Sequence, residues 1–468
     1  FIIILFSLQS QAQNWIEPVD IFHMGGLNHD PSFCIGPNGH IHCVWSQWYN
    51  VNYGIIFYSK SIDNGYSWSI AENISQNVEG SAKLPHIVSD SDNNVHLTYD
   101  FDWGYKRIQY RMFNGMSWSE TINLAQAMPY SKSNKIFVDH NDRVYCFWYS
   151  GPCFYRYMEN EIWSDILCSY DSIGYYGFNN CVIDLENNLH WIGVHSVESQ
   201  KESVTKATYF YYDYENDQWG DFVDFGEGRS LRGTDIDIDQ DEKLHIVWQE
   251  FIDQGPDPSL SITNYNFQDE NGTWSAPEYL GEAFGNQRII IDNHNQPNIF
   301  HFEIFDDSAN IVHLYRYNSN WTSSIITIEK HPGDFEVLEA NDQIYMVLQE
   351  YQNDDPPYTA EIKFTKTDLI DEINDGEQVD DFNISPNPSS HHINISFQLN
   401  SAEKVSIMVY NLQGELIKTL LNESKPSGNH QLIWNAKDEY GREVKSGLYL
   451  VRLQTDHHVQ TQRVEYMR

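Results

Sequence analysis

The sequence predicts an all-β protein whose main body is a seven-bladed β-propeller, with six or eight blades as the alternatives. The first observation is a motif that recurs along residues 14–368 at intervals of about 50 residues, the length of one four-stranded blade. The second is that each interval contains short apolar segments separated by turns and shows no helical period. The third is an aromatic content of 15% with a mean hydropathy of −0.53, which suits many short, half-buried strands.

A strand that carries a histidine, or a residue in its place, marks each repeat. Its clearest copy is Leu244–Trp248 (LHIVW), and an Asp-rich turn precedes it. The anchors of repeats 1 to 7 are His42, His96, Tyr145, His190, His245, Asn298 and Tyr345. The spacing ranges from 45 residues, between the third and fourth anchors, to 55, between the fourth and fifth. Because a residue that recurs in register is normally a packing or hydrogen-bonding element, we predict a structural role for the anchor histidines.

A segment led by Trp ends six of the repeats and predicts the outermost strand of each blade. These residues are Trp68, Trp118, Trp163, Trp219, Trp274 and Trp321. The last repeat, about 333–368, lacks such a segment, but Trp15–Ile21 matches Trp274–Leu280 in its Trp, Pro and aliphatic positions. An open ring would leave unpaired strands exposed. We therefore predict that the N-terminal strand completes the last blade and closes the ring.

The charge of the chain limits its partners. A formal net charge of −39 argues against nucleic acid, because phosphate binding needs Lys and Arg to displace counterions. It also argues against an electrostatic anchor on anionic lipid. A neutral or cationic ligand is compatible with this charge, and we expect a monomer.

The N-terminus and the cysteines indicate an exported protein. Residues 1–13 contain an apolar stretch and then small residues, and are interpreted as the remains of a signal peptide. No other segment is long and apolar enough to predict a transmembrane span. In an exported chain the six cysteines form disulfides or remain buried free thiols, and their spacing gives no zinc pattern. They are Cys34, Cys43, Cys146, Cys153, Cys168 and Cys181.

One turn carries a family motif. The segment 61–68 (SIDNGYSW) places Ser61, Asp63, Gly65 and Trp68 in the pattern S-x-D-x-G-x-[ST]-W. It resembles the Asp-box of BNR-repeat, sialidase-like propellers. We expect the carboxylate of Asp63 to accept backbone N–H bonds, Gly65 to adopt a positive φ and Trp68 to pack under the turn. The resemblance implies an Arg-Ile-Pro motif and an arginine triad in a working sialidase, but that motif is absent, so ordinary sialidase activity is not expected.

The last 85 residues carry a second resemblance. They open with Ser385–Pro388 (SPNP), continue with alternating apolar residues at 393–399, and include Val405–Gly414 and Ser446–Leu450. Residues 384–468 are similar to the type A C-terminal sorting domain of the type IX secretion system of Bacteroidetes. The resemblance implies a small Ig-like β-sandwich, a partner in the secretion machinery, and export across the outer membrane to the cell surface or the medium. The acidic segment 369–383 is interpreted as a linker.

The repeat also predicts which residues surround the mouth of the central channel. Ten positions before the anchors stand Ser32, His86, Lys135, Asn180, Asp235, Arg288 and Phe335. Five positions after the anchors stand Gln47, Phe101, Ser150, His195, Glu250, Glu303 and Glu350. We expect both sets on one face, where they either bind a carbohydrate or simply solvate the channel mouth. The candidate acids and bases are Asp235, Glu250, Glu303, His86 and His195, and the candidate ligand-binding residues are Lys135, Asn180, Arg288, Gln47 and Glu350.

No cofactor and no metal site are predicted. The acidic run Asp235–Asp241 (DIDIDQD) suggests calcium, but Asp239 and Asp241 align with the inter-strand turn of the other repeats. A structural calcium ion stays open. The preferred function is a glycan-binding or adhesive surface propeller. The alternatives are a structural surface-layer component and a polysaccharide-active enzyme, either a glycoside hydrolase or a lyase resembling the propeller ulvan lyases, which use His, Tyr and Arg at the channel mouth.

Overall fold

The computed structural model divides the chain into two compact domains, residues 1–368 and 369–468. The described residues lie between 15 and 467, with gaps at 23–25, 51–52, 77–78, 127, 129, 151–152, 171–175, 199–202, 217, 221, 227–230, 253–259, 306–307, 318–319, 327–329, 353–358, 368–381, 387–388, 390–391, 400–402, 412–415 and 455–458. The predicted signal remnant and most of the predicted linker lie outside these ranges. Within them there is no helix, and so no helix of the length and apolarity that a membrane span needs.

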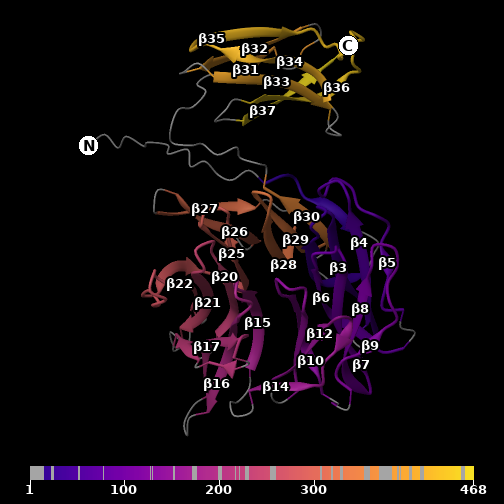
Figure 1. The fold of residues 1–468 in the computed structure, drawn as a ribbon, viewed down its shortest axis with the longest axis vertical. Helices are drawn as coiled ribbons and strands as arrows, with labels where there is room; N and C mark the ends of the chain where they lie inside the picture. Colours follow the sequence, from indigo (N-terminus) through magenta and orange to yellow (C-terminus); the bar gives the residue numbers. More distant parts are fainter. Residues whose placement is uncertain are drawn as a thin grey trace. The chain divides into compact units, whose positions relative to one another are not determined.

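The strands of the first domain follow the repeats of the sequence (Figure 1). Repeats 1 to 3 contain β2 (Leu27–Ile35), β3 (Ile41–Asn50), β4 (Tyr53–Ser61) and β5 (Glu72–Asn73); then β6 (Ser81–Ser89), β7 (Val95–Trp103), β8 (Tyr105–Phe113) and β9 (Ile122–Asn123); then β10 (Lys132–Val138), β11 (Val144–Tyr149), β12 (Cys153–Glu159), β13 (Ile162–Trp163) and β14 (Leu167–Tyr170). In each repeat the anchor strand pairs with both the strand before it and the strand after it, always antiparallel.

Repeats 4 to 7 continue in the same order. They contain β15 (Tyr176–Ile183), β16 (Leu189–Glu198), β17 (Ser203–Asp213), β18 (Gln218–Trp219) and β19 (Val223–Phe225); then β20 (Leu231–Ile238), β21 (Leu244–Ile252), β22 (Leu260–Phe267) and β23 (Glu278–Glu282); then β24 (Phe284–Ile291), β25 (Pro297–Phe305), β26 (Ser308–Tyr317) and β27 (Asn320–Ile326); then β28 (His331–Ala340), β29 (Gln343–Tyr351) and β30 (Ala360–Lys366). The all-β propeller architecture is therefore confirmed.

The N-terminal strand closes the last repeat, as predicted. Strand β1 (Val19–Phe22) pairs antiparallel with β30, and Trp15 forms a bridge with Thr367. In Figure 1 the orange strands β28–β30 lie beside the indigo strand β3. A parallel bridge between Leu27 and Ala360 joins repeats 7 and 1 into one eight-stranded sheet. Because these two repeats share a sheet, the sheets do not give the number of blades, and seven stays a prediction.

A Trp of each repeat contacts an aromatic ring of the repeat before it. The pairs, with their ring-centroid distances, are Trp118–Tyr58 (5.1 Å), Trp163–Tyr110 (4.9 Å), Trp219–Tyr155 (6.4 Å), Trp274–Tyr209 (5.5 Å), Trp321–Tyr265 (5.3 Å), Trp15–His313 (5.9 Å) and Trp68–Phe364 (5.4 Å). All seven are edge-to-face, a favoured geometry for aromatic rings. Trp15 supplies the contact that repeat 7 lacks in its own sequence, which explains why the N-terminal strand resembles the Trp-led strands.

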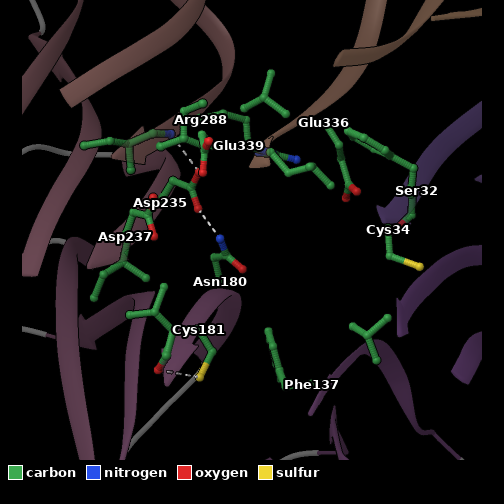
Figure 2. Close-up of a pocket in the computed structure, with 18 of the residues that line it drawn as sticks. Ser32, Cys34, Phe137, Asn180, Cys181, Asp235, Asp237, Arg288, Glu336 and Glu339 are labelled. Carbon is green, nitrogen blue, oxygen red and sulfur yellow. Dashed lines mark hydrogen bonds between the residues drawn. The ribbon is translucent and has the colours of Figure 1, made fainter. Parts of the chain in front are cut away.

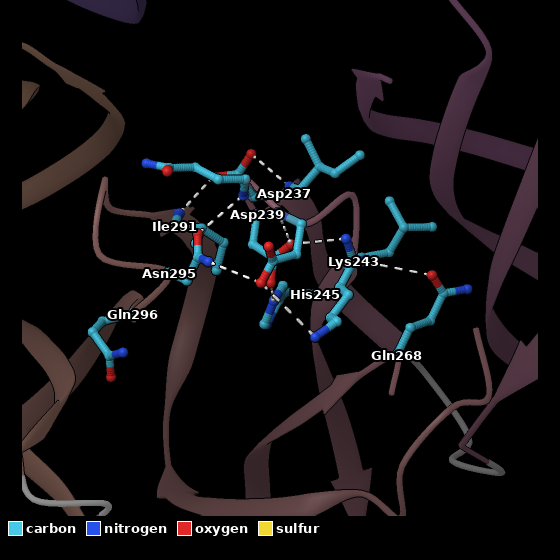
Figure 3. A network of polar contacts seen from close by, with 12 residues as sticks. Asp237, Asp239, Lys243, His245, Gln268, Ile291, Asn295 and Gln296 are labelled. Atoms are coloured by element: carbon cyan, nitrogen blue, oxygen red, sulfur yellow. Dashed lines mark hydrogen bonds and ion pairs between the residues drawn. The ribbon is translucent and has the colours of Figure 1, made fainter. Parts of the chain in front are cut away.

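The anchor histidines belong to a network that recurs in the propeller, and Figure 3 shows its copy in repeat 5. In repeat 5, Asp239 Oδ1 accepts the amides of Asp241 and Lys243 at 2.9 and 2.8 Å, and Oδ2 lies 3.4 Å from His245 Nε2. The other ring nitrogen of His245 lies 2.7 Å from the Tyr265 hydroxyl. Repeats 2 and 4 show the same arrangement with Asp90, His96 and Tyr110, and with Asp184, His190 and Tyr209. This confirms the structural role of the anchors, and the protein's own donors occupy the oxygens of Asp239.

All six cysteines are free thiols, five of them buried. Cys34 and Cys43 lie on adjacent strands but pack in different hydrophobic clusters on the two faces of the sheet. Of the two alternatives left open by the sequence, the structure shows free thiols.

The C-terminal domain consists of two antiparallel sheets around one core. One sheet contains β31 (Asn383–Ser385), β32 (Ile393–Leu399) and β35 (Gly428–Trp434), and the other contains β34 (Leu416–Lys425), β33 (Glu403–Asn411), β36 (Gly447–Gln454) and β37 (Val459–Tyr466). The alternating residues Ile393, Ile395 and Phe397 point into the core with Trp434. The sandwich expected from the resemblance is therefore present.

Candidate ligand-binding face and central channel

The first set of predicted site residues comes together in the centre of the propeller. A pocket of about 550 Å³ is lined by the innermost strands of the repeats, and Figure 2 shows it with Asn180, Asp235 and Arg288 on one side and Ser32 and Glu336 on the other. We call the following residues the channel ring: Ser32, His86, Lys135, Asn180, Asp235, Arg288 and Glu336. Each comes from a different repeat.

The seventh member of the ring differs from the predicted one. Phe335 is fully buried in the core, and its neighbour Glu336 lines the channel instead. The reason is the turn that follows. Residues 239–243 separate the paired Ile238 and Leu244 in repeat 5, whereas only 340–343 separate Glu339 and Ile344 in repeat 7. Because this turn is one residue shorter, the channel position in repeat 7 lies nine residues before the anchor and not ten. Neighbouring residues of a strand point to opposite faces, so Glu336 faces the channel and Phe335 faces the core.

Ring side chains also hold adjacent repeats together. Ser32 Oγ accepts the amide of Ile87 at 3.4 Å. His86 Nδ1 accepts the amide of Ile136 at 3.4 Å. Asp235 accepts the Ile289 amide at 2.9 Å through one oxygen and the Asn180 side-chain amide at 2.6 Å through the other. These ring residues therefore take part in the packing of the propeller, whatever else they do.

Burial shifts the pKa values of the ionisable ring residues. It raises the pKa of Asp235 and of Glu336, and it lowers the pKa of His86 and of Lys135. Arg288 behaves differently: burial acts to lower its pKa, but Asp235, Asp334 and Glu336 together raise it. Lys135 and Arg288 of the ring thus lie among the carboxyl groups of Asp235 and Glu336, and Asp237 and Glu339 add two more carboxyl groups to the lining of the pocket.

Bulges in the innermost strands shape the mouth of the channel. All seven innermost strands carry a register shift against the anchor strand, and the backbone is left-handed at Asp30, Leu84 and Ser133. Such a bulge changes the direction of the side chains that follow it. The three bulge residues line a pocket of about 180 Å³ with Asp334 and with His86, Lys135, Arg288 and Glu336 of the ring.

The second set of predicted site residues does not line these pockets within the described part of the chain. Glu350 is buried, forms an ion pair of 2.6 Å with Lys363 and accepts the Lys330 amide. Glu303 contacts His301 at 2.9 Å. Gln47 is buried, Glu250 is partly exposed, and the side chain of His195 lies outside the described residues. The strand ends that carry them lie level with the starts of the innermost strands, above the ring.

Exposed and partly exposed aromatic side chains lie at the ends of strands and in loops on one face of the propeller, and the sequence analysis did not identify them. The face that carries the connections between the second and third strands of each repeat is here called the loop face. Its aromatic band consists of Trp48, Tyr49, Tyr53, Trp103, Tyr105, Tyr130, Tyr149 and Tyr351, from repeats 7, 1, 2 and 3. Trp103, Tyr105 and Tyr130 are 54%, 62% and 74% exposed. The tyrosines and tryptophans at both ends of the short loops 49–53 and 103–105 were the signal available in the sequence.

The Asp-box hairpin lies at the opposite end of the strands. Asp63 accepts the Ser67 amide at 2.8 Å and the Ser67 hydroxyl at 2.6 Å, and Gly65 has a φ of 86°. A Cβ atom on Gly65 would lie 2.0 Å from the ring of Phe364, so the close approach requires glycine. The hairpin packs repeat 1 against repeat 7 and is remote from the loop face.

No group of three or more His, Cys, Asp or Glu side chains in the described ranges is arranged to hold a metal ion. The acidic run of repeat 5 is used instead by the turn network and by the backbone of the next repeat, where Asp237 accepts the Ile291 amide at 2.6 Å.

The comparisons with known proteins agree with this architecture. Residues 383–465 match the family described as the secretion system C-terminal sorting domain. This domain indicates export across the outer membrane to the cell surface or the extracellular space, and it implies an interaction with the secretion machinery. No curated protein matches the sequence.

Among solved structures, a polysaccharide lyase of family PL25, an ulvan lyase, has a TM-score of 0.54 at 12% identity, over 74% of this chain and 95% of its own. A protein of unknown function from Dyadobacter fermentans has a TM-score of 0.49 at 11% identity, over 76% of this chain and 99% of its own. The lyase comparison shows the fold alone, that of the β-propeller that precedes the sorting domain.

Proposed function

We propose that this exported propeller binds carbohydrate chains on the aromatic band of its loop face and does not modify them. The observation that carries the proposal is the exposure of Trp103, Tyr105 and Tyr130 on the loop face. Several large aromatic rings on one exposed face mark an interaction surface, and their apolar faces stack on the apolar faces of sugar rings.

The aromatic band is held in place before any ligand binds. Trp103 and Tyr105 are cross-strand partners at the tip of a hairpin, and Gly104 between them has a φ of 72°. Trp48 packs on His29 with a ring-centroid distance of 5.1 Å and donates to Ser46 Oγ. A preorganised surface loses little conformational entropy on binding, which favours affinity.

The channel ring supports the non-catalytic part of the proposal. Ser32, His86 and Asp235 accept backbone amides of the neighbouring repeat, and Arg288 is surrounded by carboxylates. An acid or base that already serves a structural hydrogen bond is less available to a substrate.

The test is retention of the full chain on a panel of insoluble plant, algal and host polysaccharides, with reducing ends and unsaturated products measured in parallel. The double variant Trp103→Ala/Tyr130→Ala should bind at least about tenfold more weakly, since exposed aromatic anchors dominate such interfaces. The matched control is Tyr279→Ala, which removes a 60% exposed tyrosine from β23, outside the band. Equal loss in both variants, or product formation by the wild type, contradicts the proposal.

A polysaccharide-active enzyme is the second candidate, and one observation favours it. In the ring, burial moves the pKa of Lys135 down and those of Asp235 and Glu336 up, which is the direction that a lysine or a carboxyl group needs to act as a general acid or base near neutral pH. This candidate predicts product formation that Lys135→Met abolishes while Trp103→Ala only weakens substrate binding. The absence of any product across the panel removes it.

A further inference from the structure

The channel ring separates two compartments of the central channel. One is the pocket of about 180 Å³ at the channel mouth, and the other is the larger pocket of about 550 Å³. The ring residues that line both are His86, Lys135, Arg288 and Glu336. The larger pocket, here called the inner chamber, extends from the ring to the last residues of innermost strands, among them Ile35, Ser89 and Ile238.

The inner chamber reaches the face of the propeller that lies opposite the loop face. The first three strands of a repeat are antiparallel, so the turn between the first and second strands lies at the end remote from the connection between the second and third. Ile35, Ile238 and Ile291 line the chamber and directly precede such turns. A small molecule would therefore enter from the side of the Asp-box hairpin and not from the side of the aromatic band.

A belt of mostly apolar side chains lines the inner chamber next to the ring. Residues two positions apart on a strand point to the same side, so the residues two positions after the ring members also face the channel. These residues, here called the apolar belt, are Cys34, Val88, Phe137, Val182, Asp237, Ile290 and Leu338, and all of them line the chamber. Figure 2 shows Cys34 and Phe137 around the same space as the ring residues. All but Asp237 are apolar, since a buried free cysteine behaves as a small hydrophobic residue. Apolar walls with a few polar groups, and a volume of roughly 300–1,000 Å³, are typical of small-molecule sites.

Three charged ring residues are free of the structural hydrogen bonds that other ring members make to the next repeat. Among the described residues, Lys135 forms no hydrogen bond and no ion pair, although its charge acts on Glu336. Arg288 donates to the carbonyl oxygen of the adjacent Gln287 at 3.0 Å, and Glu336 accepts no backbone amide in the described part of the chain. Charges removed from water are normally paired, because their desolvation is costly. Lys135, Arg288 and Glu336 are therefore available to a molecule in the chamber.

The ring carries both signs of charge, and this determines the class of molecule that fits it. The charges of Asp235 and Glu336 act on Arg288 across the channel. A purely anionic ligand would be attracted by the two cations but would lie beside these carboxylates, and a purely cationic ligand would meet the opposite conflict. A molecule with one group of each sign gains from both and leaves the total charge of the ring unchanged.

We propose that the inner chamber binds a zwitterionic small molecule with an apolar body, the class to which apolar α-amino acids and short apolar peptides belong. The carboxylate of the ligand binds Lys135 and Arg288, and its ammonium group binds Glu336. The rest of the ligand packs on the apolar belt. This site is separate from the proposed carbohydrate surface and does not depend on it.

The probes are L-phenylalanine and the dipeptide L-leucyl-L-phenylalanine, tested with the full chain by isothermal titration calorimetry. The comparison compounds are phenylpropionate, which lacks the ammonium group, phenylethylamine, which lacks the carboxylate, and L-serine, which lacks the apolar body. One or both zwitterionic probes should bind about tenfold more tightly than every comparison compound, because a lost hydrogen bond to a charged group costs at least that factor. Absence of binding by both probes overturns the proposal, and so does a comparison compound that binds as tightly as they do.

Two variants assign the two charges of the ligand. Lys135→Met should weaken binding of the tighter zwitterion about tenfold and remove its advantage over phenylethylamine, since the site can then no longer recognise the carboxylate. Glu336→Gln should instead remove the advantage over phenylpropionate. The matched controls are Lys243→Met and Glu120→Gln, neither of which lines the inner chamber, and both should bind as the wild type does. A zwitterion whose affinity is unchanged in both ring variants binds elsewhere, which overturns the assignment of the site.

Leu338→Phe tests the chamber without a change of charge, should the ring variants unfold. The larger side chain in the apolar belt occupies ligand space and should lower the affinity for the zwitterion about tenfold, while retention on polysaccharides stays as in the wild type. Conversely, Trp103→Ala/Tyr130→Ala should leave binding of the zwitterion unchanged. Unchanged binding by a folded Leu338→Phe variant overturns the proposal and leaves the proposed carbohydrate binding standing.

Discussion

The positions that repeat along the propeller and the positions that vary from repeat to repeat have different roles. The Asp–His–Tyr network and the Trp contacts recur in register, and their hydrogen bonds and rings lie within the protein. The channel ring places seven different residues at one position, and the aromatic band occurs in repeats 7, 1, 2 and 3. In a repeat protein, residues that recur at the same position of each repeat therefore stabilise the fold, whereas positions that vary between repeats can bind a specific ligand.

Two repeats show what happens when the recurring network changes. In repeat 3 a tyrosine replaces the anchor histidine, and Asp139 Oδ2 is buried without a hydrogen-bond partner. Burial accordingly raises the pKa of Asp139. In repeat 6 the roles are exchanged: Asn298 occupies the anchor position and donates to Asp292, and His313 on the next strand contacts Asn298 Oδ1 at 2.9 Å.

The largest effect on the free energy of unfolding is expected at Trp15, because this N-terminal residue supplies the Trp contact of repeat 7. Trp15→Ala removes the ring that packs on Phe300 and His313 and should lower the free energy of unfolding of the propeller by about 3 kcal/mol. Trp103→Ala removes an exposed Trp of the loop face and should change it by less than about 0.5 kcal/mol. Denaturant unfolding of both variants measures the difference. A loss for Trp15→Ala as small as that for Trp103→Ala would show that the N-terminal strand does not close the ring.

A second substitution pair compares an intact network with a defective one. Asp239→Asn should destabilise by about 2 kcal/mol, because the new amide cannot accept the hydrogen bond of His245. Asp139→Asn should be close to neutral, since the replaced Oδ2 has no partner there and Oδ1 still accepts the amides of Asn141 and Arg143. Thermal unfolding at neutral pH checks this, and an equal cost at both positions refutes the comparison.

The dependence of stability on pH tests His313, which is buried on β26 of repeat 6. Burial lowers the pKa of His313 to about 3, below the value of about 6.5 expected in the unfolded chain. The unfolded state therefore takes up a proton first as the pH falls below 6.5. Relative to His313→Gln, the wild type should lose about 1.4 kcal/mol of stability per pH unit between pH 6 and 4. Denaturant unfolding of both proteins across this range measures the slope, and parallel curves would mean that His313 titrates normally in the folded state.

The smallest expected effect is on polysaccharide binding, at Tyr105 of the loop face. Tyr105→Ser should weaken polysaccharide retention by roughly threefold to tenfold without a change in unfolding above about 0.5 kcal/mol. Affinity electrophoresis together with denaturant unfolding separates the two effects. A stability loss as large as that of the Trp15 variant would place Tyr105 among the structural positions.

Much of the fold could be predicted because its signals are local. The anchor histidines and the Trp-led strands can be read from residues within one repeat length, and the match of Trp15–Ile21 to a strand of repeat 5 follows from comparing two short segments. Strand pairing then has few alternatives. The candidate site was predictable in part. Alignment on the anchors found His86, Lys135 and four of the other ring residues, but it gave Phe335 in place of Glu336, because the turn of repeat 7 is one residue shorter.

The sequence by itself determined the repeat, the closing strand and the exported C-terminal domain, because each depends on patterns that recur or on an ordered set of motifs. Only the tertiary structure decided which polar residues serve the fold, since the partner of Asp235 is a backbone amide of the following repeat, 54 residues away. It also decided that aromatic side chains from loops of unrelated sequence lie on one face of the propeller. Loops vary in length and composition, so their positions on a common face follow from the ring that carries them and not from their own sequences.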